Sequence, residues 1–537
     1  QKNAVKSKSK YDYDTSGRLT AATQWTNDTN ADGVFNENDS FIKSESSYAL
    51  TENNTLKYTD FVSDVVNVDG ENEGTSQRVC EYNIHGSPVT LTDAYGAETN
   101  IEYDALNRPV KYTYDNGAVK TIEYNNIQMY TIVTDEAGVK TKNSYDVFGN
   151  IIEKSRLIDN AWTVLEKYEY DLGGRVTSKT VYNDNNVGIR EEYQYDAISR
   201  MTEKKVYELP SKLLYTEQYQ YEGVKGDNAN YINTTAVTKT TVAADNTKTA
   251  EETNYYDKFG QLIKTKLTDG STTLTSTAEY DYLGRKIKET DPEGNVTSYE
   301  YTYDGNISKK TDAAGNVMTT EYDLAGNPVA VTDANGNTSL TEYDKMGRVI
   351  KTMIPFENSS YSITKTYYDK NSNVIKQAEA NNSSLWQTKE YQYDSMGNVI
   401  ADIAVGYNND SNIVTQYNYD TAGRISEMVK GLNGYSEDTS GGAVTHYTYN
   451  NQGYLSVMTD PMGYAEYYND YDYNGNLLKR TDKNGNVFNY KYGPYGLLET
   501  SVANSEEGKE YKYNNIGRLT EASAITADGE HITEQYT

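Results

Sequence analysis

One short pattern recurs through almost the whole chain and limits what it can fold into. Residues 391–399 read Tyr-Gln-Tyr-Asp-Ser-Met-Gly-Asn-Val, and the same Tyr-Asp-x-x-Gly-(Asn/Arg)-aliphatic unit begins at Tyr13, Tyr145, Tyr343 and Tyr419. The alternating tyrosines have the two-residue period of a β-strand and lie on one face of a sheet. Asp can bind a backbone N–H two residues on, and Gly accepts a positive φ, so the second half of the unit predicts a tight turn.

A second, weaker turn lies between successive Tyr-Asp units. It has the form Asp-x-x-Gly-Asn at 312–316, 333–337 and 482–486, and Pro follows the Asp at 291–295 and 460–464. Pro presets φ for the second position of a turn. Each repeat therefore predicts a strand, a turn, a second strand and a second turn.

The spacing of the tyrosines predicts how the repeats assemble. From Tyr256 to Tyr513 the intervals lie between 19 and 30 residues, and no apolar residues recur at helical spacing. A long meander of short strands cannot stay flat, because sheets twist. We therefore predict an all-β fold, an antiparallel meander of short hairpin repeats that coils into a β-spiral or solenoid shell with open ends.

Composition favours an ordered sheet whose tyrosine-rich surface is partly exposed to water. The chain has 537 residues, of which only 36% are hydrophobic, yet it holds 54 Tyr against 7 Phe and 3 Trp. A tyrosine ring packs while its hydroxyl stays hydrogen-bonded. The formal net charge of -29 disfavours nucleic acid and anionic lipid as partners, and no apolar run is long enough to span a membrane.

We predict a single repeat array over residues 1–537, with two interruptions. Residues 20–80 read as an insertion, and residues 224–252 read as an extended hairpin insertion. The first and last residues fall within the repeat pattern, so we expect the chain to be a segment of a longer protein.

The recurrent Tyr-Asp-x-x-Gly unit resembles the YD repeat of the Rhs (rearrangement hot spot) family, over almost the whole chain. That family includes bacterial polymorphic toxins, cocoon components of insecticidal toxin complexes, wall-associated proteins and teneurins. The resemblance implies a β-strip that spirals into a hollow shell, which in the toxins encloses a C-terminal toxic domain. Toxic members also carry a cleavage core with an Asp-Pro-x-Gly-Leu-type motif. Residues 460–464 (Asp-Pro-Met-Gly-Tyr) resemble this motif only superficially, because further repeats follow at Tyr473 and Tyr513.

The insertion at 20–80 contains the one candidate ligand site. Residues 28–39 fit a twelve-residue calcium loop, with a glycine at its sixth position and Asp rather than Glu at its twelfth. Calcium binds six to eight hard oxygens, which alternating acids and amides around a tight turn supply. The predicted ligands of a structural Ca²⁺ are Asp28, Asn30, Asp32, Val34 through its carbonyl, and Asp39.

Other candidate sites carry less weight. The single cysteine, Cys80, lies five residues from His85, which is no catalytic geometry on a strand and its turn. The arginines that follow turn glycines are expected to pair with the turn Asp or to pack on tyrosine rings. Trp25, Trp162 and Trp386 could stack on sugars but are expected to pack within the repeats.

These observations predict a non-enzymatic structural protein that is secreted or displayed on a bacterial surface. The first function is part of a shell that encapsulates a C-terminal toxin or effector domain. The alternative is a surface adhesion scaffold that binds a glycan. The predicted partners are neighbouring YD repeats and shell segments of the same longer chain, an enclosed toxin domain, and a glycan or cell-surface partner.

Overall fold

A computed structural model of the chain describes residues 9–27, 40–51, 55–184, 187–224, 234–244, 248–269, 272–356, 360–381, 386–406, 412–432, 434–435, 441–504, 507–514 and 517–536. These residues form 43 β-strands in one open sheet and no α-helix, so the predicted all-β class is confirmed. Strands that follow one another in sequence pair antiparallel, as β1 does with β2 and β41 with β42. The chain divides into two compact units, described one at a time below.

Unit 1 comprises residues 1–121 and 297–444. Its first segment contains β1 (Ser9–Tyr13), β2 (Leu19–Asn27), β3 (Ser40–Leu50), β4 (Leu56–Val66), β5 (Asn72–Tyr82), β6 (Pro88–Thr92), β7 (Glu98–Tyr103) and β8 (Pro109–Thr113). Its second segment contains β24 (Ile307–Thr311), β25 (Val317–Tyr322), β26 (Pro328–Thr332), β27 (Thr338–Tyr343), β28 (Val349–Phe356), β29 (Ser360–Tyr368), β30 (Val374–Asn381), β31 (Trp386–Tyr393), β32 (Val399–Val405), β33 (Ile413–Tyr419) and β34 (Ile425–Leu432).

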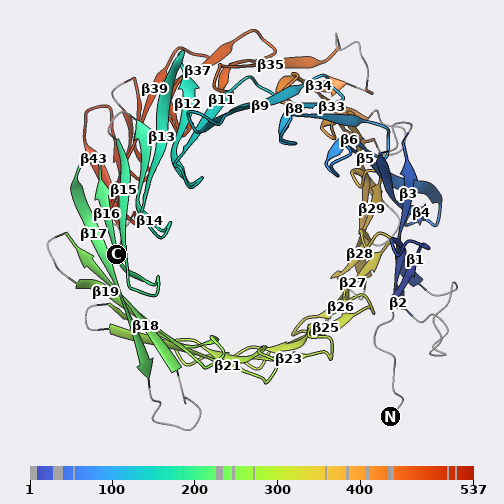
Figure 1. The fold of residues 1–537 in the computed structure, drawn as a ribbon, viewed down its shortest axis with the longest axis horizontal. Helices are drawn as coiled ribbons and strands as arrows, with labels where there is room; N and C mark the ends of the chain where they lie inside the picture. The colour runs from blue at the N-terminus through green and yellow to red at the C-terminus, as the bar shows by residue number, and fades with distance from the viewer. Residues whose placement is uncertain are drawn as a thin grey trace. The chain divides into compact units, whose positions relative to one another are not determined.

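Unit 2 comprises residues 122–296 and 445–537, and the strands β9 (Val119–Asn125), β23 (Val296–Tyr301) and β35 (Ala443–Tyr449) cross the division. Its first segment, drawn in teal to green in Figure 1, contains β10 (Tyr130–Thr134), β11 (Lys140–Tyr145), β12 (Ile151–Ile158), β13 (Ala161–Tyr170), β14 (Val176–Asp184), β15 (Val187–Tyr195), β16 (Met201–Glu208), β17 (Lys212–Val224), β18 (Thr234–Ala243), β19 (Lys248–Tyr256), β20 (Leu262–Asp269), β21 (Thr272–Tyr280) and β22 (Lys286–Thr290). Its second segment contains β36 (Leu455–Thr459), β37 (Ala465–Tyr471), β38 (Leu477–Thr481), β39 (Val487–Tyr492), β40 (Leu498–Ala503), β41 (Glu507–Tyr513), β42 (Leu519–Ile525) and β43 (His531–Gln535).

The meander gives the strip two edges, because consecutive hairpin turns alternate between them. The Tyr-Asp turns, such as 171–175 and 394–398, all lie on one edge, which we call the YD edge. The intervening turns, such as 135–139 and 333–337, lie on the other, which we call the second edge. At the YD edge the register slips by one residue before the tyrosine, as between Gln392 and Tyr393, and this bulge tightens the turn.

Within each unit the strip returns on itself as two layers. In unit 1 the turns at 67–71 and 93–97 contact residues 365–371, and Asn371 binds Asp93 across 278 positions of sequence. In unit 2 Asn183 binds Gly493 across 310 positions. In both units the second edge of the first layer meets the YD edge of the second layer. The predicted coiling is confirmed by these contacts, which run mainly through side chains.

The apolar core is thin. Its main cluster lies in unit 1, where Ala401, Val414 and Val429 are completely buried and pack with Ile403 and Leu432. Most other strand residues are half-buried, which fits a single sheet rich in tyrosine and threonine. The strip depends on hydrogen bonds and aromatic packing more than on a deep core.

The predicted insertions run as long strands within the sheet where the structure describes them. Between residues 20 and 80, β3 and β4 are 11 residues long, and β4 pairs with β5 from Lys57 to Val66. Residues 234–243 form β18, which pairs with β17 and β19. The division into one array with insertions at 20–80 and 224–252 stays a prediction.

Candidate functional site: the Tyr-Asp turn and the layer contacts

The Asp of each Tyr-Asp unit organises its own turn. The Asp394 carboxylate accepts the N–H of Met396 at 2.9 Å and the N–H of Asn398 at 2.8 Å through Oδ1, and the Asn398 side-chain amide at 3.0 Å through Oδ2. The Gly397 N–H donates to the Asp394 carbonyl at 3.1 Å, and Gly397 has a φ of 81°. A side chain at this φ would be strained, which explains the repeating glycine.

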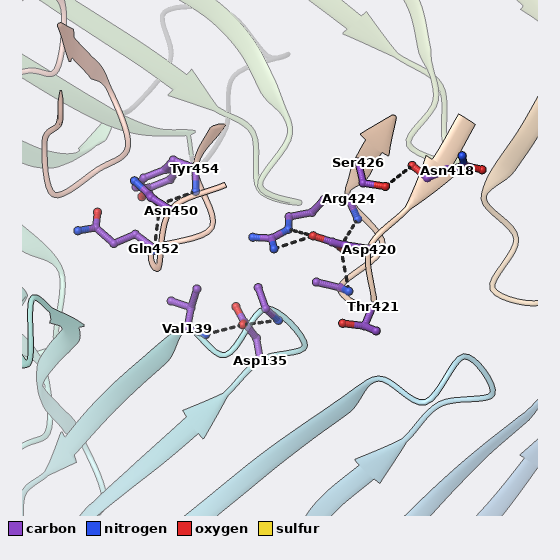
Figure 2. A network of polar contacts seen from close by, with 12 residues as sticks. Asp135, Val139, Asn418, Asp420, Thr421, Arg424, Ser426, Asn450, Gln452 and Tyr454 are labelled. Carbon is purple, nitrogen blue, oxygen red and sulfur yellow. Dashed lines mark hydrogen bonds and ion pairs between the residues drawn. The ribbon is translucent and has the colours of Figure 1, made fainter. Parts of the chain in front are cut away.

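The same turn recurs in both units. Figure 2 shows Asp135 accepting the N–H of Val139, Asn450 accepting the N–H groups of Gln452 and Tyr454, and Asp420 paired with Arg424. Asn450 replaces Asp without loss of the turn, because an amide oxygen also accepts backbone N–H groups. These side chains therefore hold their turns through hydrogen bonds to backbone N–H groups.

Where a described turn begins with Asp and ends with Arg, the Arg closes an ion pair with that Asp, and at several turns it also contacts the next repeat. Arg175 Nε donates to Asp171 Oδ2 at 2.6 Å, and its guanidinium lies 4.9 Å from the centre of the Tyr195 ring. The hydrogen bond from Arg175 holds the pKa of the Asp171 carboxyl below its usual value. The same ring contact recurs for Arg200 on Tyr221. The predicted pairing of these arginines with turn Asp and tyrosine rings is confirmed.

Two Tyr-Asp turns carry serine in place of the glycine, at Ser199 and Ser372, with φ of 68° and 69°. The strain of a positive φ is offset by a contact that glycine cannot make. Arg175 Nη1 donates to Ser199 Oγ at 3.3 Å, and Arg348 does the same to Ser372. At these two positions the arginine of one turn is hydrogen-bonded directly to the next turn.

At twelve described repeat positions a tyrosine hydroxyl fixes the register of the preceding hairpin. The Tyr393 hydroxyl donates to the Val374 carbonyl at 2.6 Å, and Val374 is the first residue of the strand that follows the previous Tyr-Asp turn. Burial raises the pKa of the Tyr393 hydroxyl. The same bond is made by Tyr103, Tyr170, Tyr195, Tyr221, Tyr280, Tyr322, Tyr343, Tyr368, Tyr419, Tyr471 and Tyr513. The aliphatic residue of the motif thus supplies a backbone acceptor as well as packing.

In unit 1 the layers are joined by charged and amide groups near the surface. The Asp69 carboxylate accepts bonds from Lys365 Nζ and from the Tyr367 hydroxyl, each at 2.6 Å. The Lys365 hydrogen bond is the main cause of a lowered pKa at Asp69, whose side chain is 42% exposed. Asn371 adds a bond from the Ala94 N–H at 2.9 Å.

In unit 2 the layers are joined by one buried amide. Asn183 is only 5% exposed. Its Nδ2 donates to the carbonyls of Gly493 at 3.1 Å and Pro494 at 2.8 Å, and its Oδ1 accepts from Asn474 Nδ2 at 2.7 Å. The Asn183 carbonyl also accepts the Tyr473 N–H at 2.9 Å. All the polar atoms of this side chain are therefore used in holding the second layer.

The residues predicted to bind calcium, Asp28, Asn30, Asp32, Val34 and Asp39, lie outside the described residues. Within the described ranges no cluster of three or more His, Cys, Asp or Glu could hold a metal ion. The calcium loop stays a prediction.

The tryptophan and cysteine candidates lie on four different strands, β2, β5, β13 and β31. Trp25 is 7% exposed, and the rings of Trp162 and Trp386 face Lys142 at 5.0 Å and Lys365 at 5.3 Å. These contacts agree with packing inside the repeats. A hydrogen bond with the Cys80 thiol, more than burial, raises the pKa of Tyr82 to about 12.

Sequence reasoning missed the residues that join the layers. Asn183 stands in a run of polar residues at 183–186 that reads as any other turn. No local signal names a partner about 300 residues away.

Comparison with protein families matches residues 183–354 to the Teneurin YD-shell model. No curated protein sequence matches the chain. Solved structures with a similar strip include TcdB2-TccC3-Cdc42 (13% identity, TM-score 0.41, 98% of this chain and 30% of that one) and TcdB2-TccC3 (14%, 0.38, 99% and 35%). A third is the Photorhabdus luminescens Tc holotoxin pore (13%, 0.34, 95% and 32%). The chain spans about a third of the length of these proteins.

No described residue belongs to a helix long and apolar enough to cross a membrane. The family model covers β15 to β27 and part of β28, and the turn chemistry of that segment continues on both sides, from Asp14 to Asn514. The Teneurin YD-shell model thus matches residues 183–354, about a third of the chain, and the same Tyr-Asp turn recurs on both sides of that match.

Proposed function

We propose that this chain is a structural wall segment of a secreted or surface-displayed Rhs/YD-repeat protein, and that the wall encloses an effector domain carried elsewhere in the longer protein. The observation that carries the proposal is the way each unit joins its layers. Two strips that are hydrogen-bonded edge to edge, and whose described Tyr-Asp turns are hydrogen-bonded internally, suit a wall better than a catalytic cleft.

The roles of the recurring residues agree with a non-enzymatic wall. The Asp carboxylates are occupied by backbone N–H groups and by Arg or Asn partners, as at Asp171 and Asp394. The tyrosine hydroxyls are occupied by carbonyls. A general acid or base needs a proton-transfer group within reach of a substrate, and these groups are held in turns instead.

Protease protection tests the proposal on the full gene product that contains these residues. If the chain walls off an effector, protease should digest that effector only after the wall is opened. The variant Asn183→Asp opens it at one place, because it turns a double donor toward two carbonyls into an acceptor. Arg200→Lys, on an exposed turn, is the matched control.

Rapid digestion of the effector in the unaltered protein would contradict the enclosure. The adhesion alternative remains a separate proposal, in which the same strip binds a glycan at the cell surface. A glycan array with the purified chain tests this alternative. Adhesion would be favoured if the chain binds a glycan, resists protease itself, and protects no effector domain from digestion.

A further inference from the structure

The contact between the two layers of unit 1 encloses a partly open cavity of about 440 Å³, which we call the seam pocket. The first layer contributes the turn at 93–97, and the second layer contributes the Tyr-Asp turns at 369–373 and 394–398 and part of β31. Small-molecule sites have volumes of roughly 300–1,000 Å³. Because the walls come from both layers where they meet, the pocket does not lie on an outer edge of either layer.

The polar walls of the seam pocket are fixed by hydrogen bonds before any ligand arrives. Asn371 joins the layers, since its Nδ2 donates to Asp93 Oδ2 at 2.5 Å and its Oδ1 accepts the Ala94 N–H at 2.9 Å. Asp369 accepts the backbone N–H of Asn373 at 2.8 Å and its side-chain amide at 3.0 Å. Groups that are already ordered lose less conformational freedom when a ligand binds.

These fixed groups keep the capacity for further hydrogen bonds. The Oδ2 atoms of Asp93, Asp369 and Asp394 each accept one side-chain amide. A carboxylate oxygen has two lone pairs, so each can accept one more donor from a ligand. The second Nδ2 hydrogen of Asn371 can donate, and the Gln392 side chain can both donate and accept.

The charge of the lining limits the ligand. No Lys, Arg or His is among the described lining residues, and the turns at 369–373 and 394–398 end in Asn373 and Asn398, whereas Asp171 has an arginine partner. Three carboxylates without a basic residue in the lining repel an anion. A cation donates but does not accept, and would leave the amide N–H groups of the pocket unused. Hydroxyl groups donate and accept, so they match the whole lining.

Tyr95 adds an apolar surface to this polar lining. It lies at the tip of the 93–97 turn and is 61% exposed. Its backbone N–H donates to Asp93 Oδ1 at 2.9 Å, so the turn uses the backbone of this residue and not its ring. A tyrosine ring packs against apolar groups while its hydroxyl stays in water. A sugar presents such a surface, because its C–H groups form a face and its hydroxyls project from the ring.

We propose that the seam pocket binds one residue of a neutral glycan. The sugar hydroxyls donate to Asp93, Asp369 and Asp394 and accept from the Asn371 amide, while the C–H face packs on the Tyr95 ring. The proposal rests on the adhesion alternative, to which it adds a site and a class of glycan.

A glycan array followed by calorimetric titration tests the site on the whole chain. The array carries neutral glycans that end in mannose, glucose, galactose or N-acetylglucosamine beside sialylated and sulfated glycans, and the chain should bind neutral glycans only. In the titration of the best-bound neutral glycan, Tyr95→Ala should weaken binding roughly tenfold, as loss of an aromatic contact does. Tyr95→Phe keeps the ring and should bind within about twofold of the unaltered chain.

A second variant fills the pocket instead of removing a contact. Ser395 lines the pocket at the second position of its turn, where the turn at 281–285 already holds Tyr282. Ser395→Tyr should therefore keep the turn and abolish detectable binding. The matched controls are Lys345→Tyr, at the same position of a turn outside the lining, and Tyr303→Ala, which removes another exposed turn tyrosine of unit 1. Both should bind as the unaltered chain does, and thermal melts check that every variant is folded.

Each contrary outcome has a distinct meaning. If Tyr95→Ala and Ser395→Tyr both bind the glycan as the unaltered chain does, the seam pocket is not the site, although adhesion itself stands. If the unaltered chain binds no glycan, this proposal and the adhesion alternative fail together, and the enclosure proposal is unaffected. Binding of acidic glycans only would overturn the neutral ligand. Calorimetric binding of spermidine in place of any neutral glycan would overturn the sugar and assign the pocket to an organic cation.

Discussion

Unit 1 and unit 2 build their strips from the same turn but join their layers with different chemistry. Unit 1 uses Asp69, Lys365 and Tyr367 at a half-exposed position. Unit 2 uses Asn183, which is buried and neutral. The comparison teaches that the repeated motif specifies the strip of hairpins. The contacts between layers, in contrast, depend on particular residues that the motif does not repeat.

The difference in burial sets how much each contact contributes to the free energy of unfolding. An exposed ion pair contributes little, because water and salt screen it. A buried amide with all its partners contributes more, since removing it leaves several buried groups unsatisfied. The layers should therefore separate more easily in unit 1 than in unit 2 when conditions turn acidic or salty.

The largest expected effect lies in a turn rather than in a layer contact. Arg348→Ala leaves the Asp344 carboxylate, whose side chain is fully buried, without its 2.6 Å ion pair, and should cost about 3 kcal/mol. Arg200→Ala removes the same pair at an exposed turn of unit 2 and should cost less than about 1 kcal/mol. Thermal melts of both variants measure the difference. Equal losses would show that burial does not separate the two turns.

The second effect tests the buried amide. Asn183→Ala leaves the Gly493 and Pro494 carbonyls and the Asn474 amide without their partner, and should destabilise the second layer of unit 2 by about 2 kcal/mol. Amide hydrogen exchange should speed up at Tyr473, whose N–H is bound to the Asn183 carbonyl. Exchange in unit 1 serves as the internal control and should not change. Protection of Tyr473 that survives the substitution would argue against the proposed role of this amide.

A smaller effect should follow from pH. Asp69 has a lowered pKa in the folded chain, so its contribution is fully present above the ordinary value of 3.8 and is lost as pH falls through the folded pKa. Because the group is exposed, the loss should be at most about 1 kcal/mol. Asp69→Asn should remove this part of the acid dependence in unit 1, and hydrogen exchange at residues 365–371 measures it. An unchanged acid profile in the variant would assign the dependence to other carboxylates.

The smallest and most local effect concerns the predicted calcium loop, which falls within unit 1. A bound ion stabilises only the ordered form of the loop that binds it. Saturating chelator should therefore lower the melting temperature slightly or increase protease nicking near 28–39, with no change in unit 2. If neither quantity moves, residues 28–39 hold no structural calcium.

Much of the strip could be predicted from the residues alone. The spacing of Tyr, Asp and Gly predicted strands and turns, and the structure adds the atoms: Asp394 Oδ1 on two N–H groups, and the Tyr393 hydroxyl on the Val374 carbonyl. The pairing of Arg175 with Asp171 was also predicted. These features could be foreseen because their partners lie within one repeat, where chain geometry leaves few choices.

The opening pattern therefore determined the β-class, the two edges and the hydrogen bonding of each turn. Only the tertiary structure decided that Asn183 meets Gly493 and that Asp69 meets Lys365. The physical reason is that such a partner depends on the sheet twist summed over many strands, and a small change in twist per strand shifts the partner by a whole turn. The same sum decides which YD turns lie against another layer, as those at 472–476 and 493–497 do.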